Sequence, residues 1–412
     1  MFEPQKSQKM VLRGFVAGLF LMLLLIGTFN ATPVHPQQEK TKIGMILPGR
    51  INDLAWNQAG YESMLRFQEK FNDRIQILWV ENHDEKAVIQ EDARSFVAQG
   101  AKLIIGHGFE YQQPLQELAV LPEYSDVAFL VVAGFNKDFP NLSIADVRTD
   151  QTGYILGWLA GKMTKNNKLG YVMGLRVAEL ARFEPNFAKG ANDANPMITY
   201  QFGNVSSIIP GQKGIKPGGT ISVVEIGDFH AVDKAKQAAA AMASQGVDVI
   251  ATMGDGVVLG TIQGAIDANV FLIGNGIDIT TAPVKGAEKL VLASGSWRWD
   301  AIFEQWFNDV SAGKRGGMLY WATMQNGGLK IDGPSTVVPS DVANGVKDLV
   351  QKVAGGQITT DQCLPACQDA AAEAPAQAAG LDLATIGAVV VIVVIIAIAA
   401  VVLRRRKPKA AT

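Results

Sequence analysis

The segment GVDVIATMGDGVVLGTIQGA, residues 246–265, contains the pattern that decides the fold. VDVIATM (247–253) is a nearly continuous apolar run, which is typical of a strand buried on both faces of a parallel sheet. A Gly-rich turn then leads into a helical pattern over 257–268. Strand, turn and helix in this order form half of a βαβ unit, so the segment predicts an α/β fold.

The same alternation extends in both directions between Thr41 and Gly356. Roughly 315 residues exceed one comfortable core, so we expect two doubly wound α/β lobes. Strands are predicted at 42–48, 75–80, 102–106, 127–133, 168–173, 197–202, 221–226, 247–253, 270–274 and 290–294. Helices are predicted at 55–71, 86–99, 112–120, 151–164, 178–194, 231–245, 257–268 and 299–312.

An apolar segment lies near each end of the chain. Residues 14–29 follow Lys6, Lys9 and Arg13, so 1–31 is predicted to be a secretory signal sequence. Cleavage after Ala31 would put a phenylalanine at the −3 position, where a small residue is preferred, so an uncleaved signal-anchor is the alternative.

Residues 383–403 form an uncharged run long enough to cross a bilayer as a helix. The basic tail at 404–412 is then cytoplasmic by the positive-inside rule, which places 40–360 outside the cell membrane as a solute-binding domain. The Ala- and Pro-rich stretch 361–380 is predicted to be a stalk linker. It contains Cys363 and Cys367, for which a local disulfide, an inter-chain disulfide and two free thiols all stay open.

Composition excludes several classes of function. The 37 Lys and Arg against 39 Asp and Glu give a net charge of −2, which argues against nucleic-acid binding. The four His have no metal-ligand spacing, so no metal site is expected. The glycines at 254, 256 and 260 have GxGxxxG spacing, which differs from the dinucleotide fingerprint, so we expect no cofactor.

Ligands of doubly wound sheets bind beyond the carboxyl ends of the strands. The loops there carry glycine, amides, carboxylates and aromatic side chains, which suit a polar, flat ligand. His107 is either a hydrogen-bonded loop residue or a ligand contact, and Phe109 either shapes the cleft or packs beneath it. Asp255 and Asn275 follow later strands and are further candidates for ligand binding.

Five stretches, in order, resemble the basic membrane protein (BMP) family, which includes purine-nucleoside-binding receptors of bacterial ABC importers. They are INDLAWNQAGYE (51–62), LIIGHGFEY (103–111), YILGWLAGKMTK (154–165), KLGYVMG with FEPNFAKGA (168–174 and 183–191), and 246–265. The resemblance implies the type I periplasmic-binding-protein fold, with two lobes joined by a hinge. We expect lobe 1 at about 41–147 and 276–318, and lobe 2 at about 148–275 and 319–356.

The resemblance also implies roles for individual residues. Asp53 and Asn57 match residues that hydrogen-bond the ligand, although Asp53 before a helix also suits an N-cap. Trp56 takes the place of an aromatic that stacks on the base, and Phe183 matches the second stacking aromatic, from the other lobe.

The chain departs from the family pattern at three points. Ala133-Gly134-Phe135 and Gly276 stand where the family often has an aspartate, with Asp278 as a substitute for the second. Trp297 stands where nucleoside binders carry a lysine. Polar contacts to a ribose are therefore missing and an aromatic is added, so the ligand is expected to be nucleoside-like or another flat heterocycle.

The resulting hypothesis is a non-enzymatic receptor that delivers its small-molecule ligand to ABC permease subunits encoded elsewhere. A sensor or regulator of the same fold is the alternative, and it would need a partner because the tail after residue 403 is short. A surface nucleoside hydrolase is a third hypothesis, which would need Asp53, Asp255 and Asp278 to converge.

Overall fold

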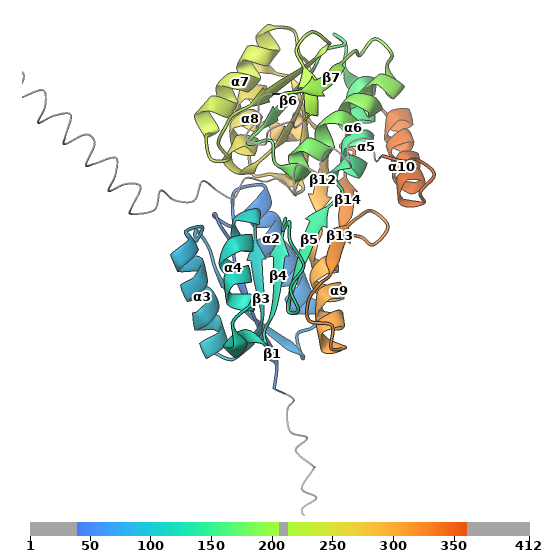
Figure 1. Ribbon diagram of the computed structural model, residues 1–412. Coiled ribbons are helices and arrows are strands. Elements are labelled where there is room, and N and C mark those ends of the chain that lie inside the picture. The colour runs from blue at the N-terminus through green and yellow to red at the C-terminus, as the bar shows by residue number, and fades with distance from the viewer. Residues whose placement is uncertain (1–38, 206–212, 361–412) are drawn as a thin grey trace, which may run out of the picture. The chain divides into compact units, whose positions relative to one another are not determined.

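The computed structural model describes residues 39–205 and 213–360, which form two six-stranded sheets and their covering helices (Figure 1). The predicted signal segment, stalk with its two cysteines, membrane span and basic tail lie outside these residues. Within the described ranges, no helix combines the length and apolar character that a membrane crossing requires.

The first sheet is parallel throughout and has the strand order β13-β5-β4-β3-β1-β2. Alternate residues of β1 point to opposite faces, as the strand period requires. Ile43 and Met45 belong to a core shared with α2 and α9, whereas Ile46 belongs to a second core under α3 and α4. The strands are β1 (Thr41–Ile46), β2 (Ile75–Val80), β3 (Ala101–His107), β4 (Ala128–Val132), β5 (Leu142–Val147) and β13 (Leu319–Ala322). The helices are α2 (Trp56–Lys70), α3 (Lys86–Ala98), α4 (Gln112–Ala119) and α9 (Trp299–Ser311), with 3-10 turns η1 (Phe109–Tyr111) and η2 (Pro122–Tyr124).

The second sheet has the order β14-β12-β11-β10-β6-β9, in which β14 alone is antiparallel to its neighbour. Its strands are β6 (Leu169–Met173), β9 (Ile221–Glu225), β10 (Val249–Met253), β11 (Phe271–Gly276), β12 (Val291–Trp297) and β14 (Leu329–Asp332). Its helices are α5 (Thr149–Met163), α6 (Ala178–Ala194), α7 (Val232–Ser244), α8 (Asp255–Ala268) and α10 (Ser340–Ala354), with 3-10 turns η3 (Ile279–Thr281) and η4 (Ala287–Lys289). A ribbon of β7 (Gln201–Asn204) and β8 (Lys213–Lys216) forms a separate sheet.

Three glycines on α5 set the position of α6. A Cβ at Gly157 would lie 2.0 Å from the carbonyl oxygen of Phe187. A Cβ at Gly153 or Gly161 would likewise come too close to a backbone carbonyl of α6. The i, i+4, i+8 spacing puts all three on one face of α5. The two helices therefore pack backbone to backbone, which fixes where the first turn of α6 lies.

In the described residues the chain passes from one sheet to the other three times: after β5, after β12, and between β13 and β14. The first two passages share an Arg-x-Asp arrangement. Arg148 binds Asp150 through both carboxylate oxygens at 2.7 and 2.8 Å, and Arg298 binds Asp300 likewise at 3.0 Å. The backbone N–H groups of both arginines donate to the third passage, at Ala322 and Gly328. The three connecting segments are thus hydrogen-bonded to one another.

The parallel α/β architecture agrees with the prediction, and three details differ. The expected lobe 1 contained 276–318, but β12 belongs to the second sheet and β13 to the first. The predicted strand 197–202 is wrong in its start and in being buried: β7 begins at Gln201 and pairs with β8 in a separate sheet, and Met197 is 66% exposed. β5, β13, β14 and α10 were not predicted, because polar residues interrupt the short strands and β5 carries Ser143 and Asp146.

Candidate functional site

A cleft of about 270 Å³ is lined by residues of both sheets' loops and by the end of β12. Its volume is slightly below the range for small-molecule pockets, roughly 300–1,000 Å³. Four aromatic side chains line it: Trp56 and Phe109 from the first lobe, and Phe229 and Trp297 from the second. The segments that follow β1, β2, β3, β6, β9 and β10, together with the end of β12, therefore supply this lining, as in doubly wound sheets.

Trp56 is held from behind by His107. The indole stacks on the imidazole with 4.6 Å between ring centroids, and its Nε1 donates to the His107 carbonyl at 2.8 Å. His107 Nε2 lies 3.1 Å from the Trp56 carbonyl, so this bond requires the Nε2–H tautomer. Burial lowers the pKa of His107 to about 3, which keeps the imidazole neutral. Gly60 allows this packing, since a Cβ there would lie 2.5 Å from His107 Nε2.

Asp53 caps the start of α2. Its carboxylate accepts hydrogen bonds from the backbone N–H groups of Ala55, Asn57 and Gln58 at 2.9 to 3.1 Å. It also accepts from Asn57 Nδ2 at 2.7 Å, and Asn57 Oδ1 accepts from the Gly49 backbone at 2.8 Å. The polar atoms of Asp53 and Asn57 are therefore engaged with the protein itself. They do not line the cleft. They fix the start of α2, where Trp56 lies.

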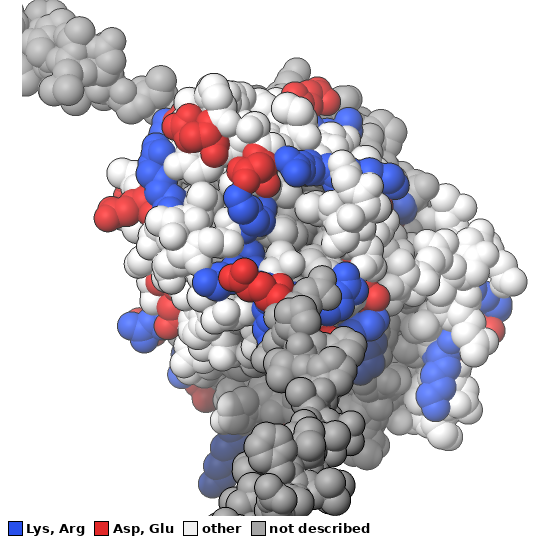
Figure 2. Space-filling view, turned by 90° about the horizontal axis from the view of Figure 1, so that it is seen from below, with Lys and Arg blue, Asp and Glu red and all other residues white. Residues whose placement is uncertain are grey.

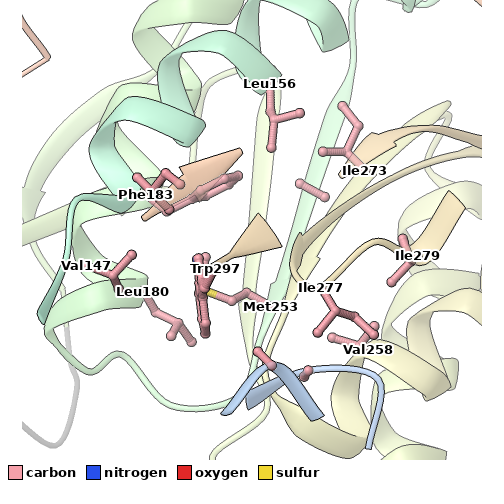
Figure 3. Close-up of a cluster of buried hydrophobic side chains, with 14 of the residues drawn as sticks. Val147, Leu156, Leu180, Phe183, Met253, Val258, Ile273, Ile277, Ile279 and Trp297 are labelled. Carbon is pink, nitrogen blue, oxygen red and sulfur yellow. The ribbon is translucent and has the colours of Figure 1, made fainter. Parts of the chain in front are cut away.

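Phe183 lies in the second-lobe core rather than in the cleft. It is fully buried and stacks on Phe187, with 5.5 Å between ring centroids, beside Tyr171. Leu180, one helical turn earlier on α6, lines the cleft together with Met253 and Trp297 (Figure 3). Leu180 and Phe183 lie on the same face of α6, and Leu180, nearer the start of the helix, lines the cleft while Phe183 packs one turn further along in the core.

Two further predicted residues lie outside the cleft. Asn275 is buried in the second lobe, and its Nδ2 lies 3.8 Å from Met253 Sδ. Asp278 caps the 3-10 turn η3, accepting from the Thr280 backbone at 2.9 Å. It lines a separate cavity of about 190 Å³, in which Arg298 and Lys330 are paired with Asp300 and Asp332. Of the ten predicted residues, the cleft brings together Trp56, Phe109, Asp255 and Trp297.

Four carboxylates line the cleft, and sequence reasoning anticipated one of them. Asp255 begins α8, after Gly254 with φ of 117°, a conformation that favours glycine. Asp84, Glu110 and Glu179 were not predicted. An isolated acidic residue in a loop or first helical turn carries no sequence signal that separates it from a solvated surface group. Their convergence becomes visible only when the chain is folded.

Three of the cleft carboxylates, Glu110, Glu179 and Asp255, have a raised pKa. Burial raises the pKa of Glu110 and of Glu179 to about 7. Burial also raises the pKa of Asp255 well above its usual range, and the charge of Asp53 raises it further. A hydrogen bond from the Trp56 backbone acts in the opposite direction on Asp255, although burial dominates. The cause is the one expected when acidic groups gather in a poorly solvated space.

The described structure does not bring together the three aspartates that the nucleoside hydrolase hypothesis requires. Asp53, Asp255 and Asp278 do not converge on one point, because Asp278 lines the other cavity. Among the described residues, no group of three or more His, Cys, Asp and Glu side chains is arranged to hold a metal ion. The arrangement of rings and carboxylates is suited to holding a flat molecule that offers hydrogen-bond donors.

Comparison with known proteins gives a consistent result. The profile of the Bmp family, described as PnrA-like ABC transporter substrate-binding proteins, matches residues 40–207 and 209–361. A purine-binding protein of Brucella abortus is 24% identical over 321 residues, which cover 78% of this chain and 83% of that protein. The nucleoside-binding protein BmpA of a Lactococcus lactis ABC transporter is 26% identical over 216 residues, covering 52% of this chain and 55% of that protein.

Solved structures share the fold. An ABC transporter solute-binding protein from Conexibacter woesei superposes with a TM-score of 0.60 at 21% sequence identity. The match covers 77% of this chain and 98% of that chain. At this identity the likeness establishes the two-lobed α/β architecture alone.

Proposed function

Because this chain belongs to the Bmp family of PnrA-like ABC transporter substrate-binding proteins, we propose that it is the extracytoplasmic receptor of an ABC importer for a flat nitrogen heterocycle. A purine nucleoside or free base is the first candidate. The observation that carries this proposal is the cleft in which Trp56 and Phe109 of one lobe face the same space as Phe229 and Trp297 of the other. Aromatic rings contribute stacking and apolar burial to a planar ligand, and carboxylates fix its orientation through N–H or O–H donors.

The receptor works by binding and release without chemical change of the ligand. Lobe closure about the three connecting segments would enclose the ligand, as in hinge-bending binding proteins. The backbone hydrogen bonds from Arg148 and Arg298 to the third segment support this proposal, because they join the connecting segments about which the lobes would move. The closed form would then be presented to permease subunits in the membrane.

The ligand class is tested by a thermal-shift screen of the full-length protein against nucleosides, free bases, flavins and neutral solutes of similar size. A ligand at 100 times its Kd adds about 2.7 kcal/mol of stability, which raises the Tm measurably. We expect purines or related rings to raise the Tm. A screen in which sugars or amino acids stabilise the protein and no heterocycle does would contradict the proposal.

We also propose that residues 383–403 hold the protein in the cell membrane, with 404–412 in the cytoplasm and the binding lobes outside. The support is the uncharged run followed by basic residues in the sequence. Full-length protein should stay in the membrane fraction after alkaline carbonate extraction. A variant that ends at residue 382 should be released if 1–31 is cleaved as a signal sequence, and should stay bound if that segment is an uncleaved anchor.

A further inference from the structure

The charges that line the cleft all have the same sign. Asp84, Glu110, Glu179 and Asp255 line it, and among the described residues that line it none is lysine or arginine. The protein surface is different: Figure 2 shows acidic and basic side chains interspersed on the face that it presents. With 37 basic and 39 acidic residues in the whole chain, four carboxylates beside a single histidine, His230, and no lysine or arginine in the same lining are a local concentration of acidic groups.

Glu179 is the member of this group that points most clearly to a ligand. Glu179 is 6% exposed and lies in the first turn of α6. Its backbone carbonyl accepts a hydrogen bond from the Thr149 hydroxyl. In the described part of the chain, no donor from another residue bonds its carboxylate. Arg182 does not neutralise it, since Arg182 Nη1 is committed to Asp146 at 2.9 Å and to the Val147 carbonyl at 2.7 Å.

The Glu179 carboxylate has a hydrogen bond from its own backbone N–H, and burial still opposes its charge. The cost of burying the ionised carboxylate is offset when a positive group occupies the space beside it. Aromatic faces act in the same direction, because their negative quadrupole attracts organic cations. Trp56, Phe109, Phe229 and Trp297 surround the same cleft as the carboxylates. Rings together with carboxylates form the lining expected for cation recognition, and His230 is the one basic side chain among the described residues that line it.

We infer that the cleft selects an organic cation, namely a flat nitrogen ring that carries positive charge, and that Glu179 and Asp255 read this charge. This inference rests on the proposed function and narrows its ligand class. The aromatic rings stack on the plane of the ligand, and the carboxylates give a charged ring a higher affinity than its neutral parent. Glu110 and Asp84 are closer to solvent and contribute to attraction at longer range.

The test uses isothermal titration of the full-length protein at low ionic strength and pH 8. The probes are neutral rings and their N-methylated cations: adenosine with 1-methyladenosine, nicotinamide with 1-methylnicotinamide, and quinoline with N-methylquinolinium. We expect a cation to be the tightest ligand, with an affinity about tenfold or more above that of its neutral parent. A neutral ring as the tightest ligand overturns this inference and leaves the proposed function standing. Absence of binding to every ring, here and in the screen above, overturns both.

A variant separates charge from shape. Glu179→Gln keeps the size of the side chain and removes its charge, so it should lower the affinity for the cation about tenfold and change the neutral parent's affinity by less than about threefold. Glu69→Gln, on the exposed side of α2, is the matched control for loss of one negative charge at a distance. Equal losses for both ligands in Glu179→Gln, with an unchanged Tm, would show that Glu179 does not read charge.

Discussion

The indole of Trp56 stacks on the imidazole of His107 and donates from Nε1 to the His107 carbonyl at 2.8 Å, so the ring is fixed before any ligand arrives. Edge contacts with Trp297 and Trp299, at 5.5 and 5.6 Å between centroids, hold it further. A pre-positioned ring loses little conformational entropy on binding. Trp56 is therefore expected to contribute more to affinity than any other single side chain of the first lobe.

Trp56→Ala should lower ligand affinity about tenfold or more, because it removes a stacking face at the centre of the cleft. Titration of wild type and variant with the tightest ligand measures the change. Trp79→Ala is the matched control, since Trp79 is 37% exposed and does not line the cleft. Equal affinity of Trp56→Ala and Trp79→Ala would show that the ligand binds elsewhere.

Asp53→Ala should act first on stability. The carboxylate bonds the start of α2 through several N–H groups, and loss of such a cap costs about 1 kcal/mol. Because Trp56 opens the same helix, a smaller, indirect loss of affinity follows. Urea unfolding and ligand titration separate the two effects. A large loss of affinity with unchanged unfolding free energy would assign Asp53 a direct ligand contact instead.

Phe183 and Leu180 distinguish the core from the cleft. Phe183→Leu should destabilise the protein by roughly 1.5 kcal/mol and leave affinity nearly unchanged, since Phe183 is fully buried against Phe187. Leu180→Ala should lower affinity as well as stability, because Leu180 lines the cleft. If Phe183→Leu weakens binding more than Leu180→Ala does, Phe183 stacks on the ligand and α6 must turn on binding.

The stability of the free protein should fall as pH rises through neutrality. The folded-state pKa of Glu110 and Glu179 is raised to about 7 from 4.5, so the folded protein holds protons that the unfolded chain releases between these values. Unfolding then releases protons, and linkage makes stability decrease with pH across that window. Thermal melts at pH 5, 6, 7 and 8 should show a declining Tm. Glu179→Gln should flatten the decline, and a Tm that rises from pH 5 to 8 would contradict it.

Binding of a cation should strengthen over the same interval, because the ligand favours the ionised carboxylates. A neutral ring should show no such increase. The charged and titratable groups around Glu179 are Asp146, Tyr171, Arg182 and Glu110. Those around Glu110 and Asp255 are Asp84, Asp53 and Glu179, and His230 lines the same cleft. Titrations of 1-methyladenosine and adenosine at pH 6 and pH 8 measure the difference. Affinity for the cation that is equal at both pH values would contradict this prediction.

Long apolar runs made most of the fold predictable. Strands such as VDVIATM are buried on both faces and stand out, and most of the helices between them are recognisable from their spacing. β5 escaped prediction because Ser143 and Asp146 break its pattern. The sheet to which β12 belongs is decided by long-range pairing with β11 and β14, which no local pattern encodes.

The site was predictable only where a loop follows a strand directly. Trp56, Phe109, Asp255 and Trp297 lie at such ends and reach the cleft. Phe183 did not, because it lies one turn further along α6 than Leu180, on the same face, where it packs against Phe187 in the core. Glu179 was missed for the converse reason: its significance comes from burial and from the absence, among the described residues, of a hydrogen-bond donor on another residue, and neither is visible in a single sequence.

A crystal structure of the protein with the tightest heterocycle from the screen tests the central claim most directly. The ring should lie within about 4 Å of the Trp56 indole, in van der Waals contact. Its donors should lie within hydrogen-bond distance of Asp255 or Glu179. A ligand found instead in the cavity beside Asp278 and Arg298, with the cleft at Trp56 unused, would contradict the account.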